Sequence, residues 1–265
     1  MLFKKIRNFI SLLRRTPSQN QNITVYESEG TVEYYKNQEF HLQLAEQKII
    51  KILEMKLSQY TMLDIGVGTG RTSNFFAPLV SKYVGVDYSS RMVDVCREKF
   101  PRLTFDVQDV RSIQYPNNSF DLVLFSFNGL DSISPEERIK AMDEIYRIIK
   151  PGGYFAFSSH NLKGIDKLFS FPVTLNVKKW YKTIVLRSVN KNFRKFYKEN
   201  YVTIIDGAHG YGVTNYYTTP EYQCKQLAQC GYGDLVVIDL NGNSSTPEGA
   251  INHKDLWLYY LGRKV

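Results

Sequence analysis

Short apolar runs alternate along the chain with amphipathic stretches of helical length. We expect the apolar runs to be buried strands, and they cover residues 62–65, 83–86, 103–107, 121–127, 154–158, 235–240 and 256–261. Apolar residues recur every three or four positions in residues 39–57 and 135–149, as in helices with one buried face. Strands that alternate with helices predict an α/β fold built on a mainly parallel sheet.

The first predicted strand breaks into a glycine loop. Gly66, Gly68 and Gly70 follow Asp64 at alternate positions, and a helix-like segment comes next over residues 72–79. Glycine lets the backbone turn sharply and approach a ligand closely. The start of a helix offers free N–H groups to an anionic group. The spacing differs from the G-x-G-x-x-G pattern of dinucleotide-binding loops, so it predicts a ligand site of another kind.

Polar residues follow the next predicted strands at the points where they end. Asp87 ends the second strand, Asp109 lies just past the third, and Asn128 follows the fourth. In a doubly wound sheet, ligands bind beyond the carboxyl ends of the strands. We therefore expect these side chains to lie at one edge of the sheet, beside the glycine loop.

Five of these segments resemble the core of class I S-adenosylmethionine-dependent methyltransferases. They are LDIGVGTGR, VGVDYS, DVQDV, FDLVLFSFNGL and KPGGYFAFS, in the same order and spacing as in that family. The resemblance covers residues 40–160 and is only general for residues 1–35 and 161–217. It implies a Rossmann-like doubly wound sheet of seven strands with the last strand antiparallel. It also implies S-adenosyl-L-methionine as the cofactor.

The resemblance assigns roles to the residues around the glycine loop. It places the backbone of Gly66, Gly68 and Gly70 against the amino acid tail of S-adenosylmethionine. Asp64 is then expected near the ammonium group of that tail. Asp87 is expected at the ribose, where its two carboxylate oxygens can accept both hydroxyl protons.

The same resemblance extends to the third and fourth strands. Asp109 and the backbone N–H of Val110 are expected at the adenine ring, with Phe127 and Asn128 beside the cofactor. Two interpretations of Arg71 stay open. It either pairs with the tail carboxylate or only begins a helix at the surface.

Methyl transfer to a hydroxyl or an amine also needs a group that removes a proton. His160 closes the fifth predicted strand at the active edge of the sheet, and histidine is a side chain that commonly serves as a base near neutral pH. Asp131 follows the fourth strand and is the second catalytic candidate, although an acid at this place can also serve a helix start. His209 lies in a predicted turn, where we expect it to be exposed to solvent.

The chain divides into four predicted parts. They are a basic amphipathic helix with a polar linker (1–22), the cofactor-binding core (23–160), an inserted α/β substrate cap (161–217) and the C-terminal part of the core sheet (218–265). The cap contains a predicted hairpin of residues 201–205 and 213–217 and is expected to lie over the crevice. Tyr34 and Tyr35 precede the first strand, where members of the resembled family often cover the cofactor. Packing is the alternative role for this pair.

Charge is concentrated in two segments. The net charge is +8, yet residues 178–198 contain eight basic residues and no acid, and residues 1–15 contain five and no acid. Residues 2–15 have helical apolar spacing with basic residues mostly opposite, and two interpretations stay open. The helix either lies on an anionic membrane surface or packs on the body of the protein.

The composition limits the remaining possibilities. Cys96, Cys224 and Cys230 have no metal-ligand spacing, so we predict no metal site and interpret them as reduced thiols of a cytoplasmic protein, with peripheral membrane contact open. No apolar run reaches the ~20 residues of a membrane span. The pattern predicts no particular oligomeric state.

We interpret the chain as a methyltransferase that acts on an oxygen or nitrogen of a small acceptor, anionic or sugar-like because the predicted cap is basic and aromatic. One alternative is an RNA methyltransferase that uses residues 178–198 on phosphates. We disfavour nucleic acid as a partner, since the chain has no N-P-P-Y-type motif and no appended RNA-binding module. A second alternative is a non-catalytic S-adenosylmethionine-binding protein.

Overall fold

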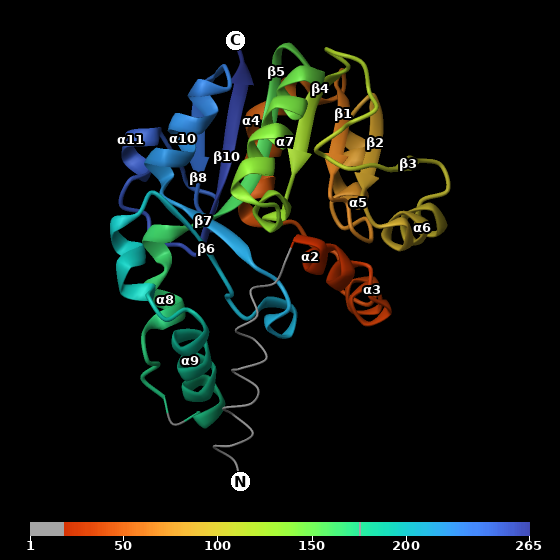
Figure 1. The fold of residues 1–265 in the computed structure, drawn as a ribbon. Coiled ribbons are helices and arrows are strands. Elements are labelled where there is room, and N and C mark those ends of the chain that lie inside the picture. Colours follow the sequence, from red (N-terminus) through yellow and green to blue (C-terminus); the bar gives the residue numbers. More distant parts are fainter. Residues whose placement is uncertain (1–18, 175) are drawn as a thin grey trace.

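One sheet organises the part of the chain that the structure describes. The computed structural model describes residues 19–265, apart from residue 175 (Figure 1). Over these residues ten strands join in the order β3-β2-β1-β4-β5-β10-β8-β9, with β6 and β7 attached beside β5. The strands are β1 (Thr61–Ile65), β2 (Lys82–Asp87), β3 (Thr104–Val107), β4 (Phe120–Phe125), β5 (Ile149–Asn161), β6 (Tyr201–Ile204), β7 (Asn215–Thr218), β8 (Tyr232–Ile238), β9 (Ser244–Ser245) and β10 (Trp257–Lys264).

The direction of the strands confirms the predicted doubly wound sheet. Strands β1 to β5 pair in parallel, whereas β10 runs antiparallel between β5 and β8. These seven strands are the ones expected from the apolar runs, and β6, β7 and β9 are additions. The chain moves outward from β1 through β2 to β3 and then returns to the other side of β1 as β4. A crevice therefore lies beyond the ends of β1 and β4.

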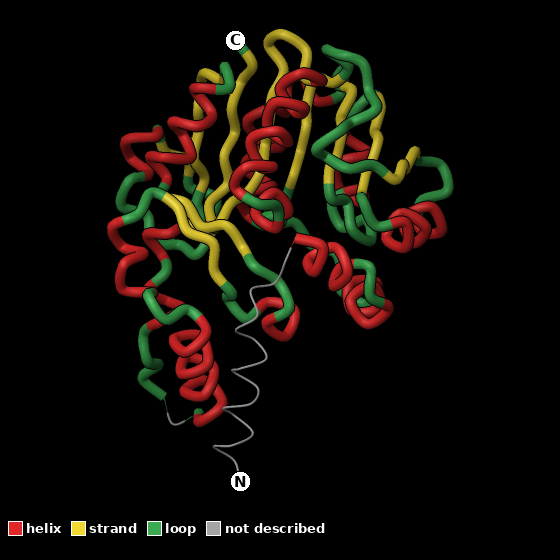
Figure 2. The backbone as a smooth tube through the Cα atoms, viewed as in Figure 1, coloured by secondary structure: helices red, strands yellow, loops and turns green. Residues whose placement is uncertain are grey.

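Helices cover both faces of the sheet. On one face α7 (Pro135–Ile148), α10 (Pro220–Gln229) and α11 (Pro247–Ala250) enclose a core that includes Leu63 and Ile65. On the other face α4 (Leu44–Leu57), α5 (Ser73–Phe76) and α6 (Ser90–Lys99) enclose a core that includes Met62. Figure 2 shows the sheet between these two layers. Alternate residues of β1 thus face opposite cores, as the two-residue repeat of a strand requires.

Two predicted helices differ in detail from the structure. Helix α4 begins at Leu44, later than the predicted Glu39, because Gln43 acts as its N-cap in a capping box with Glu46. Ile52 in α4 and Ile139 in α7 were expected on buried stripes but are 40% and 53% exposed. Neither helix is fully embedded, so each buries a narrower stripe than its apolar periodicity suggests.

The segment between β5 and α10 forms a small unit with its own core. It contains α8 (Asp166–Phe169), α9 (Val177–Val189) and the β6–β7 hairpin. The predicted hairpin is confirmed, and β7 also pairs in parallel with the end of β5. Its core consists of Leu162, Ile165, Phe169, Leu186, Val202, Ile204 and Tyr217. The 3₁₀ turns of the chain are η1 (Ala77–Leu79), η2 (Gly129–Ser132), η3 (Leu162–Gly164), η4 (Phe193–Lys198) and η5 (Ala208–Tyr211).

Two short helices precede the core, in place of part of the predicted linker. They are α2 (Gln19–Tyr26) and α3 (Glu29–Lys36). The predicted boundary at residue 22 falls inside α2, and the side chain of Asn22 is buried there. Its amide donates to the carbonyls of Ser132 and Thr214. The helix predicted for residues 2–15 lies outside the described residues, and no helix within the described chain is long and apolar enough to span a membrane.

Candidate active site

A pocket of about 350 Å³ lies beyond the carboxyl ends of β1, β2 and β4. Its floor is the glycine loop, and its walls include Asp64, Asp87, Asp109, Val110 and Phe127. The N-terminal helices contribute Asn22, Tyr26, Tyr34 and Tyr35 to the lining. The structure therefore gathers most of the predicted cofactor residues in one place.

The three glycines of the loop have different surroundings. All three have positive φ, which other residues rarely adopt. A Cβ on Gly68 would have no atom within 4 Å, so this residue leaves open space above the loop. A Cβ on Gly70 would lie 2.4 Å from the ring of Phe100, and Gly70 does not line the pocket. Gly68 thus fits close approach of a ligand, whereas Gly70 makes room for core packing.

The acids at the ends of β1 and β2 are buried and hydrogen-bonded. Asp64 accepts a hydrogen bond of 2.6 Å from the hydroxyl of Tyr83, and burial raises the pKa of Asp64 to about 6. Asp87 accepts the backbone N–H groups of Gly68 and Ser89, each at 2.9 Å. Burial also raises the pKa of Asp87. A cationic or hydroxyl-bearing ligand beside either carboxylate would stabilise its charged form.

Asp109 already has a strong partner. Its carboxylate pairs with Arg111 at 2.5 Å, and this hydrogen-bonded contact lowers the pKa of Asp109. Arg111 also reaches Glu137, at the start of α7. A contact with adenine would use the remaining acceptor capacity of Asp109, beside the backbone of Val110.

Arg71 is part of a buried ion pair, which neither interpretation of this residue anticipated. Its guanidinium binds both carboxylate oxygens of Glu46, at 2.6 and 2.7 Å, and lies 4.3 Å from the ring centre of Phe127. Glu46 is fully buried and also accepts from the hydroxyls of Ser126 and Tyr259. Arg71 still lines the pocket, so the pair fixes one wall of it.

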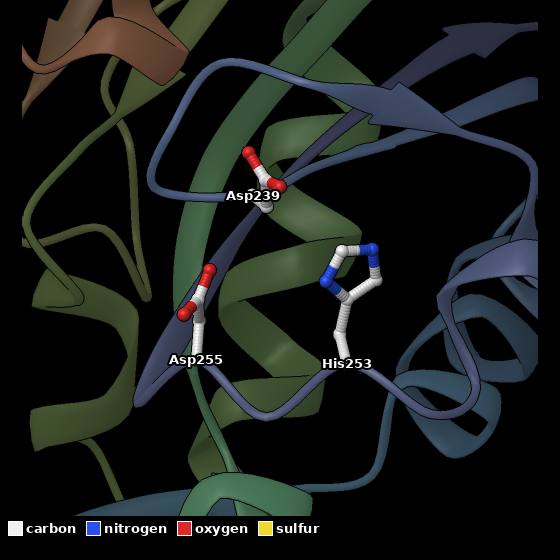
Figure 3. A group of neighbouring side chains, drawn as sticks. All are labelled: Asp239, His253 and Asp255. Carbon is white, nitrogen blue, oxygen red and sulfur yellow. The ribbon is translucent and has the colours of Figure 1, made fainter.

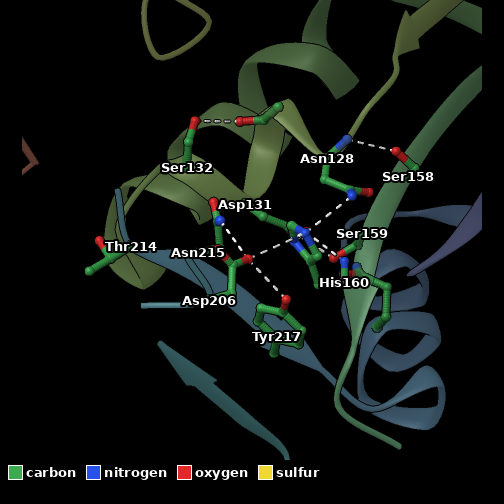
Figure 4. A network of polar contacts seen from close by, with 12 residues as sticks. Asn128, Asp131, Ser132, Ser158, Ser159, His160, Asp206, Thr214, Asn215 and Tyr217 are labelled. Carbon is green, nitrogen blue, oxygen red and sulfur yellow. Dashed lines mark hydrogen bonds and ion pairs between the residues drawn. The ribbon is translucent and has the colours of Figure 1, made fainter. Parts of the chain in front are cut away.

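His160 and Asp131 form a directly hydrogen-bonded pair (Figure 4). Nδ1 of His160 lies 2.8 Å from Oδ2 of Asp131, and the same oxygen accepts the backbone N–H of His160 at 2.6 Å. Asp131 is 1% exposed and forms a 2.7 Å ion pair with Arg138, which is fully buried. We predicted Asp131 as a catalytic group in its own right. The structure encloses it, and its carboxylate can act only through His160.

The other ring nitrogen of His160 lies beside Asn128 and Asp206, and His160 is not one of the residues that line the pocket. Nε2 lies 3.3 Å from the amide nitrogen of Asn128 and 3.9 Å from a carboxylate oxygen of Asp206, and the ring stacks on Tyr217 (Figure 4). Because a carboxylate only accepts, Nδ1 carries the proton of the neutral ring and Nε2 is free to accept one. Asn128 was expected to touch the cofactor. Asn128 does not line the pocket, but its chain neighbours Phe127 and Gly129 do, and its own amide contacts His160.

The cover of the pocket comes from the N-terminal helices and the turn at His209. Tyr35 lines the pocket, and its hydroxyl lies 3.4 Å from Nε2 of His209, while Tyr26 packs edge-on against that ring at 4.8 Å. His209 was expected in solvent, but it is half-buried, and burial lowers its pKa. Among the described residues, the pocket lining includes none from 161–217. Of the predicted cap (161–217), the turn at His209 packs against Tyr26 and Tyr35 of the cover, whereas the basic segment 178–198 contributes no lining residue.

A second group of titratable side chains lies away from the pocket. Asp239, His253 and Asp255 place one potential ligand atom each within 4.8 Å of one another (Figure 3). Asp239 accepts the backbone N–H groups of Asn241 and Asn243, and Asp255 pairs with Lys167 at 3.4 Å. These contacts indicate that the group holds the loop between β8 and β10 in place.

Five residues of the site were not predicted from the sequence. They are Asn22, Tyr26, Glu46, Arg138 and Asp206. The capping-box spacing of Gln43 and Glu46 was a usable signal for the start of α4, but it does not reveal the partner Arg71. Nothing in the order of residues signals that Asp206, in a turn after β6, comes near His160.

Comparison with known proteins places the central segment in a family. Residues 62–153 match the model of a methyltransferase domain. A ubiquinone/menaquinone biosynthesis C-methyltransferase of Hydrogenovibrio crunogenus is 36% identical over 101 residues, which are 35% of this chain and 39% of that protein. A demethylmenaquinone methyltransferase of Paenarthrobacter aurescens is 27% identical over 141 residues, 53% of this chain and 51% of that protein. The chain thus spans about half or less of the length of these curated relatives.

The fold is shared with solved methyltransferases. The crystal structure of a 1,6-didemethyltoxoflavin-N1-methyltransferase from Burkholderia thailandensis superposes with a TM-score of 0.57 at 13% identity, covering 94% of this chain and 91% of that one. Three features indicate the same fold. They are the matched methyltransferase domain, the glycine loop with its buried acids and the antiparallel last strand. Residues 62–153 thus form a methyltransferase domain, and the described residues have the Rossmann-like fold of S-adenosylmethionine-dependent methyltransferases, which supports S-adenosylmethionine as the cofactor.

Proposed function

We propose that this chain transfers a methyl group from S-adenosylmethionine to a small acceptor, and that His160 takes up the proton the acceptor loses. The hydrogen-bonded pair of His160 and Asp131 carries the proposal. A buried carboxylate that fixes one ring nitrogen and leaves the other able to accept a proton is the arrangement of a positioned base. His160 lies directly behind the lining, in contact with Asn128, whose neighbours Phe127 and Gly129 line the pocket.

The residues around the glycine loop fit the cofactor. The open space above Gly68 admits close approach of the amino acid tail, with Asp64 nearby as a partner for its ammonium group. Asp87 would receive the ribose hydroxyls, while Asp109 and Val110 would meet the adenine. When bound, S-adenosylmethionine supplies an electrophilic methyl group on a sulfonium, so positioning provides much of the catalysis.

His160 provides the acid–base part of the reaction. As the bond from the acceptor atom to the methyl carbon forms and the carbon–sulfur bond breaks, the acceptor proton moves to Nε2 of His160. Nε2 can take up the proton once its weak 3.3 Å contact with the amide of Asn128 breaks. Hydrogen bonds of catalytic groups often become short and well aligned only when the substrate is bound. Asp131 at 2.8 Å and Asp206 at 3.9 Å then stabilise the imidazolium.

A small acceptor agrees with the pocket and with the relatives. Helices α2 and α3 contribute three tyrosines, Tyr26, Tyr34 and Tyr35, to the lining of a pocket of about 350 Å³, a size that suits a small molecule. The two curated relatives above are named for demethylmenaquinone and for ubiquinone/menaquinone biosynthesis, and the solved relative contains 1,6-didemethyltoxoflavin. We expect an acceptor whose hydroxyl, amine or acidic carbon loses a proton. The anionic or sugar-like character expected from the basic segment has no support from the pocket lining.

An acceptor screen with radiolabelled S-adenosylmethionine tests the proposal. Quinols, phenols and heterocyclic amines are offered to the full chain and to the His160→Ala variant, with His253→Ala as a histidine control outside the pocket. Calorimetry should show that all three proteins bind S-adenosylmethionine. Methylation by the wild type that is lost only in His160→Ala supports the assignment. Equal methylation by His160→Ala would remove His160 from the mechanism, and no binding by the wild type would remove the function itself.

A further inference from the structure

Helix α9 carries an exposed apolar stripe. Val177, Trp180, Tyr181 and Ile184 are spaced as neighbours on one side of a helix, and they are 78%, 42%, 38% and 46% exposed. The stripe continues into the preceding loop, where Val173 is completely exposed. Contiguous apolar surface of this kind marks a site of contact with another molecule or a membrane.

The stripe is held in a defined position. Val185 and Leu186 of the same helix are buried, and Leu186 lies on the side opposite the stripe. The indole of Trp180 stacks on Phe171 with ring centres 5.0 Å apart and donates to the carbonyl of Thr174 at 2.8 Å. The exposed aromatic pair is therefore fixed by the fold, and the helix has a separate buried side that attaches it to the protein.

The charge around the stripe is of one sign. Residues 178–198, which we call the basic segment, contain eight basic residues and no acid. Within the described chain, none of these eight forms an ion pair with a carboxylate. Lys178 and Lys179 lie in the first turn of α9, where positive charge opposes the helix dipole. Lys178 and Lys179 therefore do not stabilise α9, and an interaction with an anionic partner explains their position better.

The position of α9 makes the stripe accessible to a flat partner. Figure 1 shows α9 at the end of the molecule, beyond the β6–β7 hairpin and away from the central sheet. The exposed loop residues Phe171 and Val173 precede this helix directly. A planar surface could therefore contact the stripe without meeting the core.

We propose that α9, together with the exposed residues Phe171 and Val173, docks on a lipid bilayer with anionic headgroups. The aliphatic side chains and Trp180 would enter the interface between headgroups and acyl chains, where tryptophan is enriched. The lysines and arginines of the basic segment would meet the anionic headgroups. RNA offers phosphates but would leave Val173, Val177 and Ile184 uncovered, since aliphatic side chains do not stack on bases. This surface is separate from the pocket and does not depend on the proposed reaction.

Vesicle sedimentation tests the docking surface. The full chain is mixed with vesicles of phosphatidylcholine alone or with phosphatidylglycerol in equal amounts. We expect sedimentation with the anionic vesicles and a loss of about tenfold in partitioning for Trp180→Glu/Ile184→Glu, because two charges would enter the interface. The matched control is Met55→Glu/Ile139→Glu, which adds the same charges on exposed aliphatic sites of α4 and α7. Failure of the wild type to sediment, or equal binding by the Trp180 and Ile184 variant, overturns the proposal.

Fluorescence provides a second measurement on an unaltered docking surface. The chain has two tryptophans, so Trp257→Phe leaves Trp180 as the reporter. Insertion predicts a blue shift with anionic vesicles and quenching by brominated acyl chains. An unchanged spectrum despite sedimentation would assign membrane binding to another segment, such as residues 1–15. Salt-sensitive binding to total tRNA without any vesicle binding would replace the bilayer by a nucleic acid as the partner.

Discussion

Nδ1 of His160 lies 2.8 Å from a carboxylate oxygen of Asp131, and the same carboxylate binds the guanidinium of Arg138 on its other side. Asp131 thus joins the ring of His160 to a charge that is fully buried. One substitution at Asp131 should therefore affect both the base and the stability of the fold, and the two effects can be measured separately.

The first prediction concerns Asp131→Asn. The amide can no longer hold the Nδ1 proton of His160 as a carboxylate does, so we expect kcat to fall by about 10²–10⁴-fold. Loss of a charge from the buried pair with Arg138 should also cost about 3–5 kcal/mol of folding free energy. Steady-state kinetics well below the melting temperature isolate the first effect, and urea unfolding gives the second. His160→Ala serves as the comparison, since it should lower kcat without leaving Arg138 unpaired.

A double variant tells positioning apart from an independent role. If Asp131 acts through His160, His160→Ala/Asp131→Asn should be no slower than His160→Ala alone, because residues that act as a unit are not additive. A further large loss in the double variant would mean that Asp131 contributes to the reaction by another route.

The sheet and the glycine loop could be predicted because they rest on local patterns. The apolar run before Gly66 and the acid after the second strand lie close in sequence to the elements they define. The same holds for His160, which ends a strand whose direction follows from the fold. A doubly wound sheet brings strand ends together, so residues that end strands converge without further information.

Tyr34 and Tyr35 line the pocket, as their place before the first strand suggested, but the ion pairs could not be predicted, because they depend on distant partners. Arg71 and Glu46 are 25 residues apart, and His160 and Asp206 are 46 apart. Asn22 looked like part of a polar linker, yet its amide binds two carbonyls far along the chain. The basic segment suggested a cover by its charge, but charge does not determine which way an inserted helix is attached.

A second prediction concerns the buried pair of Glu46 and Arg71. Glu46→Gln keeps the shape of the side chain but leaves the guanidinium without its counter-charge, which should cost about 3 kcal/mol in urea unfolding. The matched control is Glu144→Gln, because Glu144 pairs with Arg147 near the surface, where the cost should stay below about 1 kcal/mol. Equal effects of the two substitutions would show that burial of the Arg71 pair has little energetic weight.

The contrast between two glycines gives a third prediction. Gly68→Ala places a methyl group in open space above the loop, so it should weaken S-adenosylmethionine binding more than it destabilises the fold. Gly70→Ala drives a Cβ to 2.4 Å from Phe100 and should mainly lower the melting temperature. Both residues have positive φ, so the backbone strain is shared and cancels in the comparison. Calorimetric affinity and thermal unfolding of the two variants measure the difference, and a reversed ranking would contradict the assignment of Gly68 to the ligand side.

The last prediction uses the buried carboxyl of Asp64. Its pKa is raised by burial from 3.8 to about 6, so the folded protein holds a proton that the unfolded chain has already released between these values. Stability from this group is therefore full below pH 3.8 and declines as the pH rises to about 6, by about 3 kcal/mol in all. Urea midpoints measured from pH 4 to 7 should show this decline in the wild type and not in Asp64→Asn. An ammonium group beside Asp64 favours the ionised form, so S-adenosylmethionine should bind more tightly as the pH rises through 6 and should release a proton on binding below it. Calorimetry at pH 5.5 in buffers of different ionisation enthalpy measures that proton. Proton release of the same size in Asp64→Asn would place the titrating group elsewhere in the pocket.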